Sequence, residues 1–84
     1  MGMWRVDVPR SVERALERIP ADDRERILGA LAEMVQNPFA GDTKKLGDDE
    51  YRRRVGSYRI FFDLHRNQRI IFVSRVERRT STTY

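Results

Sequence analysis

The sequence contains no cysteine and only one histidine among its 84 residues. The lack of cysteine excludes disulfide bonds, thiolate metal sites and cysteine nucleophiles, and it is typical of proteins from a reducing compartment. A single histidine leaves almost no ligands for a histidine-based metal site, so we expect neither a metal nor another cofactor. No apolar run approaches the ~20 residues of a membrane-spanning helix, and the N-terminus has no signal-peptide apolar segment. These absences predict a cytoplasmic protein with no membrane partner.

Charge is abundant but unevenly distributed along the chain. The 17 basic and 13 acidic residues give a formal net charge of +4. Residues 1–49 contain eight Lys or Arg and ten Asp or Glu, whereas residues 50–84 contain nine Arg and three Asp or Glu. This asymmetry indicates a polyanionic partner. Arginine, which supplies 15 of the basic residues, binds phosphate oxygens in a bidentate manner. A GC-rich genome also enriches arginine, but it does not explain the asymmetry.

The apolar pattern divides the chain, which is long enough for one domain only, into helices and strands. Residues 3–8 alternate as a strand, and residues 10–19 have helical spacing. A second helix is predicted from an N-cap at Asp22 to the residues before Pro38. After a loop over residues 39–49, strands are predicted over residues 51–55, 58–64 and 69–78, with turns at 56–57 and 65–68. We predict an α+β domain over residues 1–84 with the order β-α-α-β-β-β. The N-terminal strand and a helical hairpin pack on one face of an antiparallel meander sheet.

The turn at residues 56–57 sets the register of the first hairpin. It places Arg54 opposite Arg59, and Arg52 opposite Phe61, on the face away from the helices. Arg53 is the only charge on the core face, and we expect it to reach a helix carboxylate. In the last strand, Arg75 and Arg79 share one parity with Ile71 and Val73. If this parity belongs to the outward face, five arginines surround Phe61 there: Arg52, Arg54, Arg59, Arg75 and Arg79.

Like charges directly opposite each other destabilise a hairpin. Folding therefore gives no reason for Arg54 to face Arg59, whereas a bound phosphate does. The alternative is that Asp63, Glu77 or loop carboxylates neutralise the arginines as ordinary surface pairs. His65 is expected to be a solvated turn residue.

Three segments resemble the RelE/ParE toxin superfamily: KKLG at 44–47, YRRRVGSYRI at 51–60 and VSRVERR at 73–79. The predicted order of elements is similar as well, so the resemblance covers almost the whole chain and implies a RelE-like fold. The RelE branch implies a toxin of a type II toxin–antitoxin system, namely a metal-independent endoribonuclease (mRNA interferase). It would bind the 70S ribosome and mRNA, cleave the mRNA in the A site and inhibit translation. It would be held inactive by an acidic, RelB-like antitoxin that folds on binding.

The resemblance also implies how the reaction proceeds and which residues perform it. The substrate's 2′-hydroxyl attacks the adjacent phosphate, leaving a 2′,3′-cyclic phosphate and a 5′-hydroxyl. By position, the basic pair of the first hairpin strand, the phosphate-binding arginine, the residue near the leaving group and the base-stacking tyrosine are Arg52, Arg54, Arg59, Arg79 and Tyr84. Around this catalytic set we expect five substrate-binding residues: Lys44, Lys45, Phe61, Arg75 and Arg78.

Two positions depart from the RelE pattern. Arg52 stands where RelE has a lysine proposed as proton acceptor, and a permanently protonated arginine is a poor base. Glu50 or a water molecule is the alternative acceptor. Tyr84 is displaced from the commonest spacing. Other functions stay open: a ParE-like DNA gyrase inhibitor, which generally lacks this basic and tyrosine set, a non-catalytic nucleic-acid-binding module, or an interaction-only domain.

Overall fold

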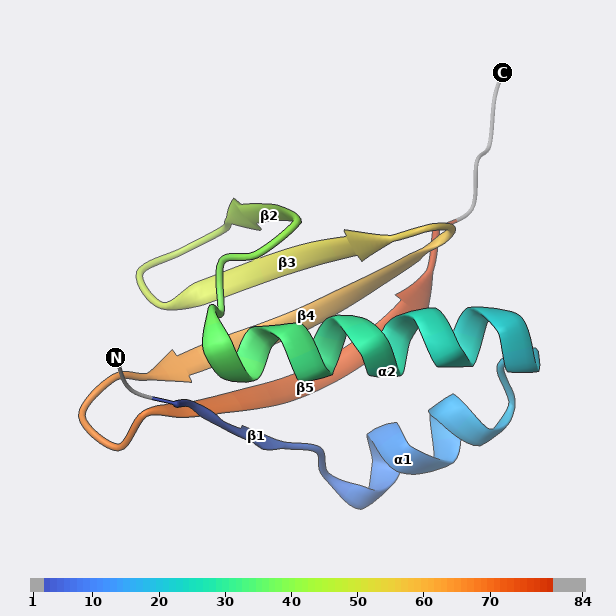
Figure 1. Ribbon diagram of the computed structural model, residues 1–84, viewed down its shortest axis with the longest axis horizontal. Helices are drawn as coiled ribbons and strands as arrows, with labels where there is room; N and C mark the ends of the chain where they lie inside the picture. Colours follow the sequence, from blue (N-terminus) through green and yellow to red (C-terminus); the bar gives the residue numbers. More distant parts are fainter. Residues whose placement is uncertain (1–2, 80–84) are drawn as a thin grey trace.

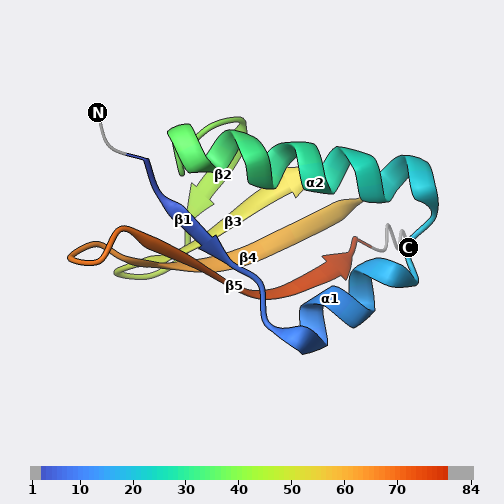
Figure 2. The same cartoon turned by 60° about the horizontal axis from the view of Figure 1, so that its bottom comes forward.

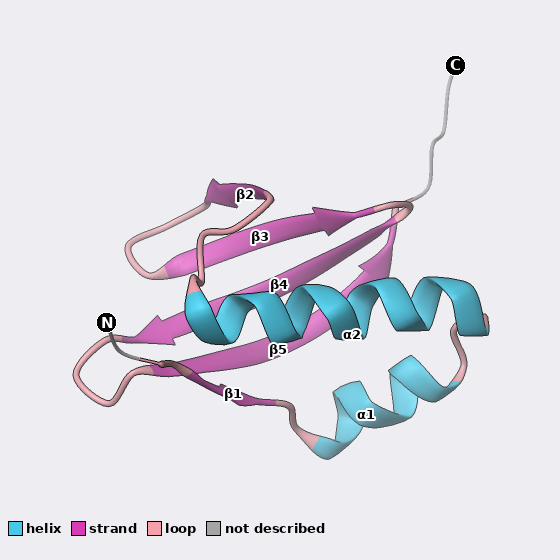
Figure 3. Cartoon of the chain, in the orientation of Figure 1, coloured by secondary structure: helices cyan, strands magenta, loops and turns pink. Residues whose placement is uncertain are grey.

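The computed structural model describes residues 3–79. Both helices cover one side of a twisted five-stranded sheet (Figure 1, Figure 3). Seven elements follow one another along the chain: β1 (Arg5–Asp7), α1 (Arg10–Glu17), α2 (Ala21–Gln36), β2 (Asp42–Lys45), β3 (Glu50–Val55), β4 (Tyr58–His65) and β5 (Ile70–Arg78).

Prolines precede both helices and set where they begin. The second helix was predicted to begin from an N-cap at Asp22, and this is wrong, because the cap position lies two residues earlier, at Pro20, which makes no side-chain cap hydrogen bond, and α2 begins at Ala21. Asp22 and Asp23 instead lie in the first turn, where carboxylates interact favourably with the helix dipole. The predicted end is confirmed, since α2 stops at Gln36. Neither helix within residues 3–79 is long and apolar enough to cross a membrane.

The sheet has the strand order β1-β5-β4-β3-β2. Its centre is the predicted antiparallel meander of β3, β4 and β5. The strands at the two edges of the sheet, β1 and β2, were not predicted to pair there. β1 pairs in parallel with β5, which the long crossover through both helices permits. Residues 42–45, predicted to be loop, form β2 along β3. This polar segment has no apolar alternation, so only pairing with β3 makes it a strand.

One hydrophobic cluster lies between the helices and the inner sheet face. In β4, every second residue is buried, which confirms the predicted alternation. α1 packs against β5, while α2 crosses β1 and β3 (Figure 2). The largest fully buried side chains come from both layers: Ile27, Met34, Ile60, Phe62, Ile71 and Val73.

The first hairpin has the predicted register. Gly56, at φ 58°, forms the two-residue turn with Ser57, and a glycine with positive φ is what such turns require. The pairs that follow the turn are Val55 with Tyr58, Arg54 with Arg59, Arg53 with Ile60, and Arg52 with Phe61.

A β-bulge decides which residues of β5 face outward. Phe61 pairs with Arg75, whereas the next residue of β4 pairs with Val73, so Ser74 is an extra residue. Before the bulge, Ile71 and Val73 point into the core and are fully buried. After it, Arg75 faces outward beside Phe61. The expectation that Ile71, Val73 and Arg75 point to the same face is therefore wrong. Arg75 nevertheless lies on the outer face, as predicted.

The turn between β4 and β5 spans residues 66–69, one residue later than predicted. His65 pairs with Ile70 as the last residue of β4 and is exposed, as expected. Its ring centroid lies 6.4 Å from that of Phe72 in an edge-on arrangement. His65 therefore belongs to the outer sheet surface rather than to the turn itself.

Candidate nucleic-acid interface

The sheet face away from the helices carries a cluster of cationic side chains. Strand pairing aligns Lys44 with Arg52, Arg54 with Arg59, and Phe61 with Arg75. Because side chains alternate along a strand, all of these residues share the outer face. We call the basic members the outer cluster: Lys44, Arg52, Arg54, Arg59 and Arg75.

Arg54 and Arg59 face each other across the β3–β4 hairpin. Directly opposed residues have Cβ atoms roughly 4.5–5.5 Å apart, and like charges there are destabilising. Asp42 partly compensates Arg54, because its Oδ2 lies 3.3 Å from Arg54 Nε. Within residues 3–79, Arg59 forms no ion pair, and its Nε is buried without a hydrogen-bond partner. An unsatisfied buried donor costs about 1–3 kcal/mol, so stability does not explain this arrangement.

Arg52 shows the same feature. It lies between Lys44 and Phe61 in the sheet, and its Nε is also buried without a partner among the described residues. Its partners on the two adjacent strands offer a second cation and an aromatic ring rather than a carboxylate. Within residues 3–79, Arg52 and Arg59 therefore form no ion pair, and the Nε of each lacks a hydrogen-bond partner.

Arg75 is held in a different way. Its Nε donates to Glu77 Oε2 at 2.6 Å, and its Cζ lies 4.0 Å from the centroid of the Phe61 ring. This is cation–π geometry. Arg54 and Arg75 thus form ion pairs with surface carboxylates. Among the described residues, Arg59 lies opposite Glu77 without forming an ion pair, and Arg52 lies opposite no carboxylate.

Two carboxylates occupy the other end of the same face. Glu50 pairs with Asp63, and within residues 3–79 neither forms an ion pair. Glu50 is four residues from Arg54, roughly 13 Å along the strand, so a phosphate held between Arg54 and Arg59 lies beyond its reach. A hollow of about 140 Å³ opens beside them, lined mainly by Leu46, Glu50, Phe61, Asp63, Ser74 and Arg75.

Several expected site residues do not join the outer cluster. Lys45 pairs with Tyr51, and Arg78 pairs with Tyr58. Both tyrosines are buried on the inner face, so alternation places Lys45 and Arg78 on that side of the sheet as well. Tyr84 lies outside the described residues.

Arg79 follows β5 at the end of the described chain. Its backbone N–H donates to the carbonyl of Ser57 in the β3–β4 turn. It is exposed and is four residues from Arg75, so it continues the outward parity of β5 after the bulge. Arg79 therefore stands beside the Arg54–Arg59 end of the face.

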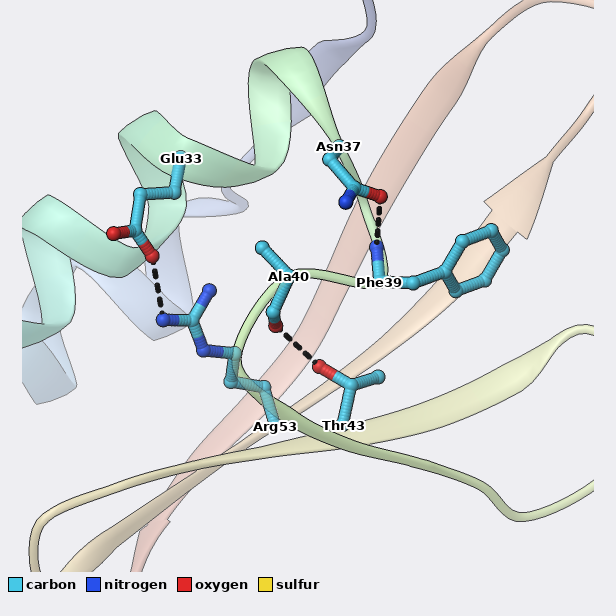
Figure 4. A network of polar contacts seen from close by, with 6 residues as sticks. All are labelled: Glu33, Asn37, Phe39, Ala40, Thr43 and Arg53. Atoms are coloured by element: carbon cyan, nitrogen blue, oxygen red, sulfur yellow. Dashed lines mark hydrogen bonds and ion pairs between the residues drawn. The ribbon is translucent and has the colours of Figure 1, made fainter.

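Arg53 supports β2 from the core side, as expected (Figure 4). It is only 8% exposed, and its Nη2 donates to Glu33 Oε1 of α2 at 2.6 Å. The guanidinium also passes closely beneath Gly41, where an added Cβ would lie 2.6 Å from Arg53 Cζ. Thr43 Oγ1 donates to the carbonyl of Ala40 at 2.7 Å. These contacts hold the segment that carries β2, and with it Asp42 and Lys44, against β3.

A second ion pair holds the acidic end of the face. Arg66 donates from Nε to Asp49 Oδ1 at 2.9 Å and from Nη2 to the Tyr51 hydroxyl at 3.0 Å. The hydrogen bond to Asp49 raises the pKa of Arg66 above its ordinary value. The contact ties the β4–β5 turn to the residues just before β3, next to Glu50. Among residues 3–79, no group of three or more His, Asp or Glu is placed to hold a metal ion.

Comparison with known families assigns the chain to one of them. A family model described as the ParE toxin of the type II toxin–antitoxin system, parDE, matches residues 5–82. The chain belongs to this family. It is a toxin of a type II toxin–antitoxin system and a member of the RelE/ParE superfamily. No curated protein matches the toxin.

Solved structures share the fold of the toxin. An archaeal RelE–RelB complex from Pyrococcus horikoshii OT3 matches with a TM-score of 0.89 and 24% identity, over 95% of this chain and 99% of that chain. The isolated E. coli RelE toxin matches with a TM-score of 0.81 and 18% identity, over 94% of this chain and 87% of that chain. The intact E. coli RelBE toxin–antitoxin complex matches with a TM-score of 0.77 and 20% identity, over 94% of this chain and 99% of that chain. These matches confirm the predicted RelE-like α+β fold.

Proposed function

We propose that this toxin is an endoribonuclease that cleaves mRNA in the ribosomal A site and thereby inhibits translation. The observation that carries the proposal is the opposed pair of Arg54 and Arg59 with Arg52 beside it on one open face. Within residues 3–79, Arg52 and Arg59 form no ion pair, and their Nε atoms have no hydrogen-bond partner. A phosphodiester is the ligand that best suits such a cluster. The resemblance of the hairpin to RelE supports the choice of RNA.

In the proposed reaction, the 2′-hydroxyl oxygen forms a bond to the adjacent phosphorus and the bond to the 5′-oxygen breaks. Negative charge grows on the phosphoryl oxygens in the transition state. Arg54 and Arg59 come from neighbouring strands, and we expect their guanidinium groups to stabilise this charge. A preorganised donor of this kind contributes about 3 kcal/mol, or roughly a hundredfold in rate. Arg52 stays protonated, so it supplies charge, and the 2′-hydroxyl proton passes to a water molecule. The 5′-oxygen takes a proton from a second water molecule and leaves as the 5′-hydroxyl.

The remaining basic residues position the substrate. Lys44 lies next to Arg52 at the sheet edge and is suited to a backbone phosphate. Arg79, beside the β3–β4 turn, is suited to the leaving 5′-oxygen. The Arg75–Phe61 stack gives a flat surface on which a base can lie. The proposal places the toxin in the cytoplasm with its ribosomal substrate.

The proposal includes an antitoxin that covers the outer cluster. Relatives with this fold are found in complexes with RelB antitoxins. For this toxin we expect an acidic partner that folds on binding, since its carboxylates would compensate Arg52 and Arg59. Coexpression of the toxin with the small acidic product of an adjacent gene should restore growth. Failure of every neighbouring gene to rescue growth would contradict this part of the proposal.

The nuclease activity is tested by inducing the toxin in bacteria and mapping the 5′ ends of transcripts. We expect cuts in phase with the reading frame in the wild type, and none with Arg59→Ala or Arg79→Ala. Arg14→Ala on the exposed face of α1 is a matched control that should keep both the cuts and the growth arrest. Growth arrest without cuts, or cuts that persist in both Arg59→Ala and Arg79→Ala, would remove the nuclease assignment.

The matched family is described as the ParE toxin, and the resemblance to the ParE branch implies a second candidate function, inhibition of DNA gyrase. A gyrase cleavage assay separates the two activities. Double-strand breaks stabilised by the purified toxin, in the absence of RNA cleavage, would establish the ParE-like activity. We expect no such breaks.

A further inference from the structure

The outer sheet face is divided into two ends of opposite charge. Arg54 opposes Arg59 at one end, and Glu50 opposes Asp63 at the other. The carboxylate pair carries the same stability cost as the arginine pair, because like charges oppose each other directly. Within residues 3–79, no cation pairs with Glu50 or Asp63. Phosphate is repelled from this end, so its ligand must instead offer hydrogen-bond donors.

A hollow of about 140 Å³ lies at the carboxylate end, large enough for one nucleobase. Glu50 and Asp63 form part of its lining, as do Phe61 and Arg75. Glu77 holds Arg75 with its guanidinium over the Phe61 ring. Guanidinium planes and aromatic rings are the surfaces on which proteins stack unpaired RNA bases. The hollow therefore combines a stacking surface with two acceptors.

The acceptors select among the bases by their chemistry. An ionised carboxylate only accepts hydrogen bonds, and its two oxygens can take two parallel donors. Guanine is the base whose Watson–Crick edge presents two adjacent donors, the N1–H and the 2-amino group. Adenine and cytosine each present one exocyclic amino group there, beside a ring nitrogen that would be repelled by the carboxylate.

We infer that this hollow is a guanine-binding subsite of the toxin, in which Glu50 and Asp63 read the base edge and Arg75 with Phe61 supports the ring. The inference rests on the proposed RNA substrate. Glu50 is two residues from Arg52 along β3, roughly 7 Å. The guanine therefore belongs to a nucleotide next to the phosphate that the outer cluster holds. This makes Asp63 and Glu50 specificity residues rather than catalytic ones.

The test measures binding without cleavage. Short 2′-O-methyl RNAs, in which the attacking hydroxyl is blocked, carry guanine, adenine, cytosine, uracil or hypoxanthine at one position of a constant sequence. Affinity for the purified wild-type toxin is measured by fluorescence anisotropy at one salt concentration. We expect guanine to bind about tenfold or more tightly than the other bases. Hypoxanthine, which keeps the N1–H but lacks the 2-amino group, should bind more weakly than guanine and more tightly than adenine.

Variants separate base reading from charge. Asp63→Asn and Glu50→Gln each remove one negative charge with little change in shape, and each should bring the guanine preference close to one. Glu25→Gln, an exposed residue of α2, makes the same charge change on the opposite side and should keep the preference. A general gain of affinity for all five RNAs with the guanine preference intact would overturn the inference. Thermal melting confirms that each variant is folded.

The outcomes distinguish the subsite from the nuclease proposal. Guanine preference in a toxin that cuts no RNA supports the subsite and removes the nuclease. Equal affinity for all five RNAs, or no binding of any of them, overturns the subsite. Whether all five RNAs bind equally or none binds, mapping the cleavage of transcripts still tests the nuclease activity independently.

Discussion

Replacing Arg59 by methionine should make the toxin more stable and inactive at once. Methionine keeps the length of the apolar stem but removes the guanidinium. If Arg59 is present for a ligand rather than for folding, removing its charge relieves the folded state of an unfavourable group. It also removes a cation that the proposed transition state requires.

The magnitude follows from the neighbours of Arg59. Repulsion from Arg54 and attraction to Glu77, which pairs with Arg59 on β5, are each roughly 0.2–1 kcal/mol and largely cancel. The unsatisfied Nε remains, at a cost of about 1–3 kcal/mol. Because Arg59 is only half-buried, we take the low end and expect a gain of about 1 kcal/mol. For a domain of this size, that raises the Tm by about 4–8 °C.

Thermal melting and growth arrest are measured on the same variant. We expect toxicity to fall by about a hundredfold, and the salt dependence of RNA binding to decrease by about one released counterion. Arg14→Met on α1 is the matched control. It should leave toxicity intact and change the stability by no more than about 0.5 kcal/mol.

Two results would refute the reasoning. A Tm lowered by several degrees in Arg59→Met would show that the arginine stabilises the fold. Full toxicity in a folded Arg59→Met variant would show that the residue has no part in the activity. The first result concerns only the energetics of the pair, and the second concerns the proposed function.

The remaining predictions concern the support of the outer face. Glu33→Ala should lower the free energy of unfolding by about 2 kcal/mol, because it leaves the buried Arg53 without its carboxylate. Adding Arg53→Met should recover most of this loss. An unchanged denaturant midpoint in Glu33→Ala alone would contradict this prediction. Gly41→Ala should cost about 1–3 kcal/mol, because φ is 70° and the new Cβ meets the guanidinium; melting checks this, and a wild-type Tm would show that the segment relaxes freely. Deleting Ser74 removes the β-bulge but leaves Arg75 directly after the inward-facing Val73 and still opposite Phe61, so alternation keeps Arg75 on the outer face and toxicity should be retained; loss of toxicity in a folded deletion variant would show that the bulge itself is required.

The first hairpin could be predicted from the sequence alone. Its turn chemistry and its two-residue period are local properties, and together they determined the pairing of Arg54 with Arg59 and of Arg52 with Phe61. The assignment of Arg53 to a helix carboxylate followed from the same alternation, since a charge on the core face must find a partner. Helix positions were also predictable, apart from the start of α2, where the proline displaced the expected aspartate cap.

Other features depended on tertiary contacts. β2 is polar throughout. It becomes a strand only because β3 offers it hydrogen bonds and because the Arg53 guanidinium packs against Gly41, just before β2. Arg75 faces outward because Ser74 interrupts the pairing with β4. Neither event leaves a periodic signal in the sequence. The opposed carboxylates of Glu50 and Asp63 follow from the predicted register, but the hollow beside them exists only once β5 brings Arg75 over Phe61. Local chemistry thus determined which residues share a strand face, whereas contacts between distant strands decided what that face encloses.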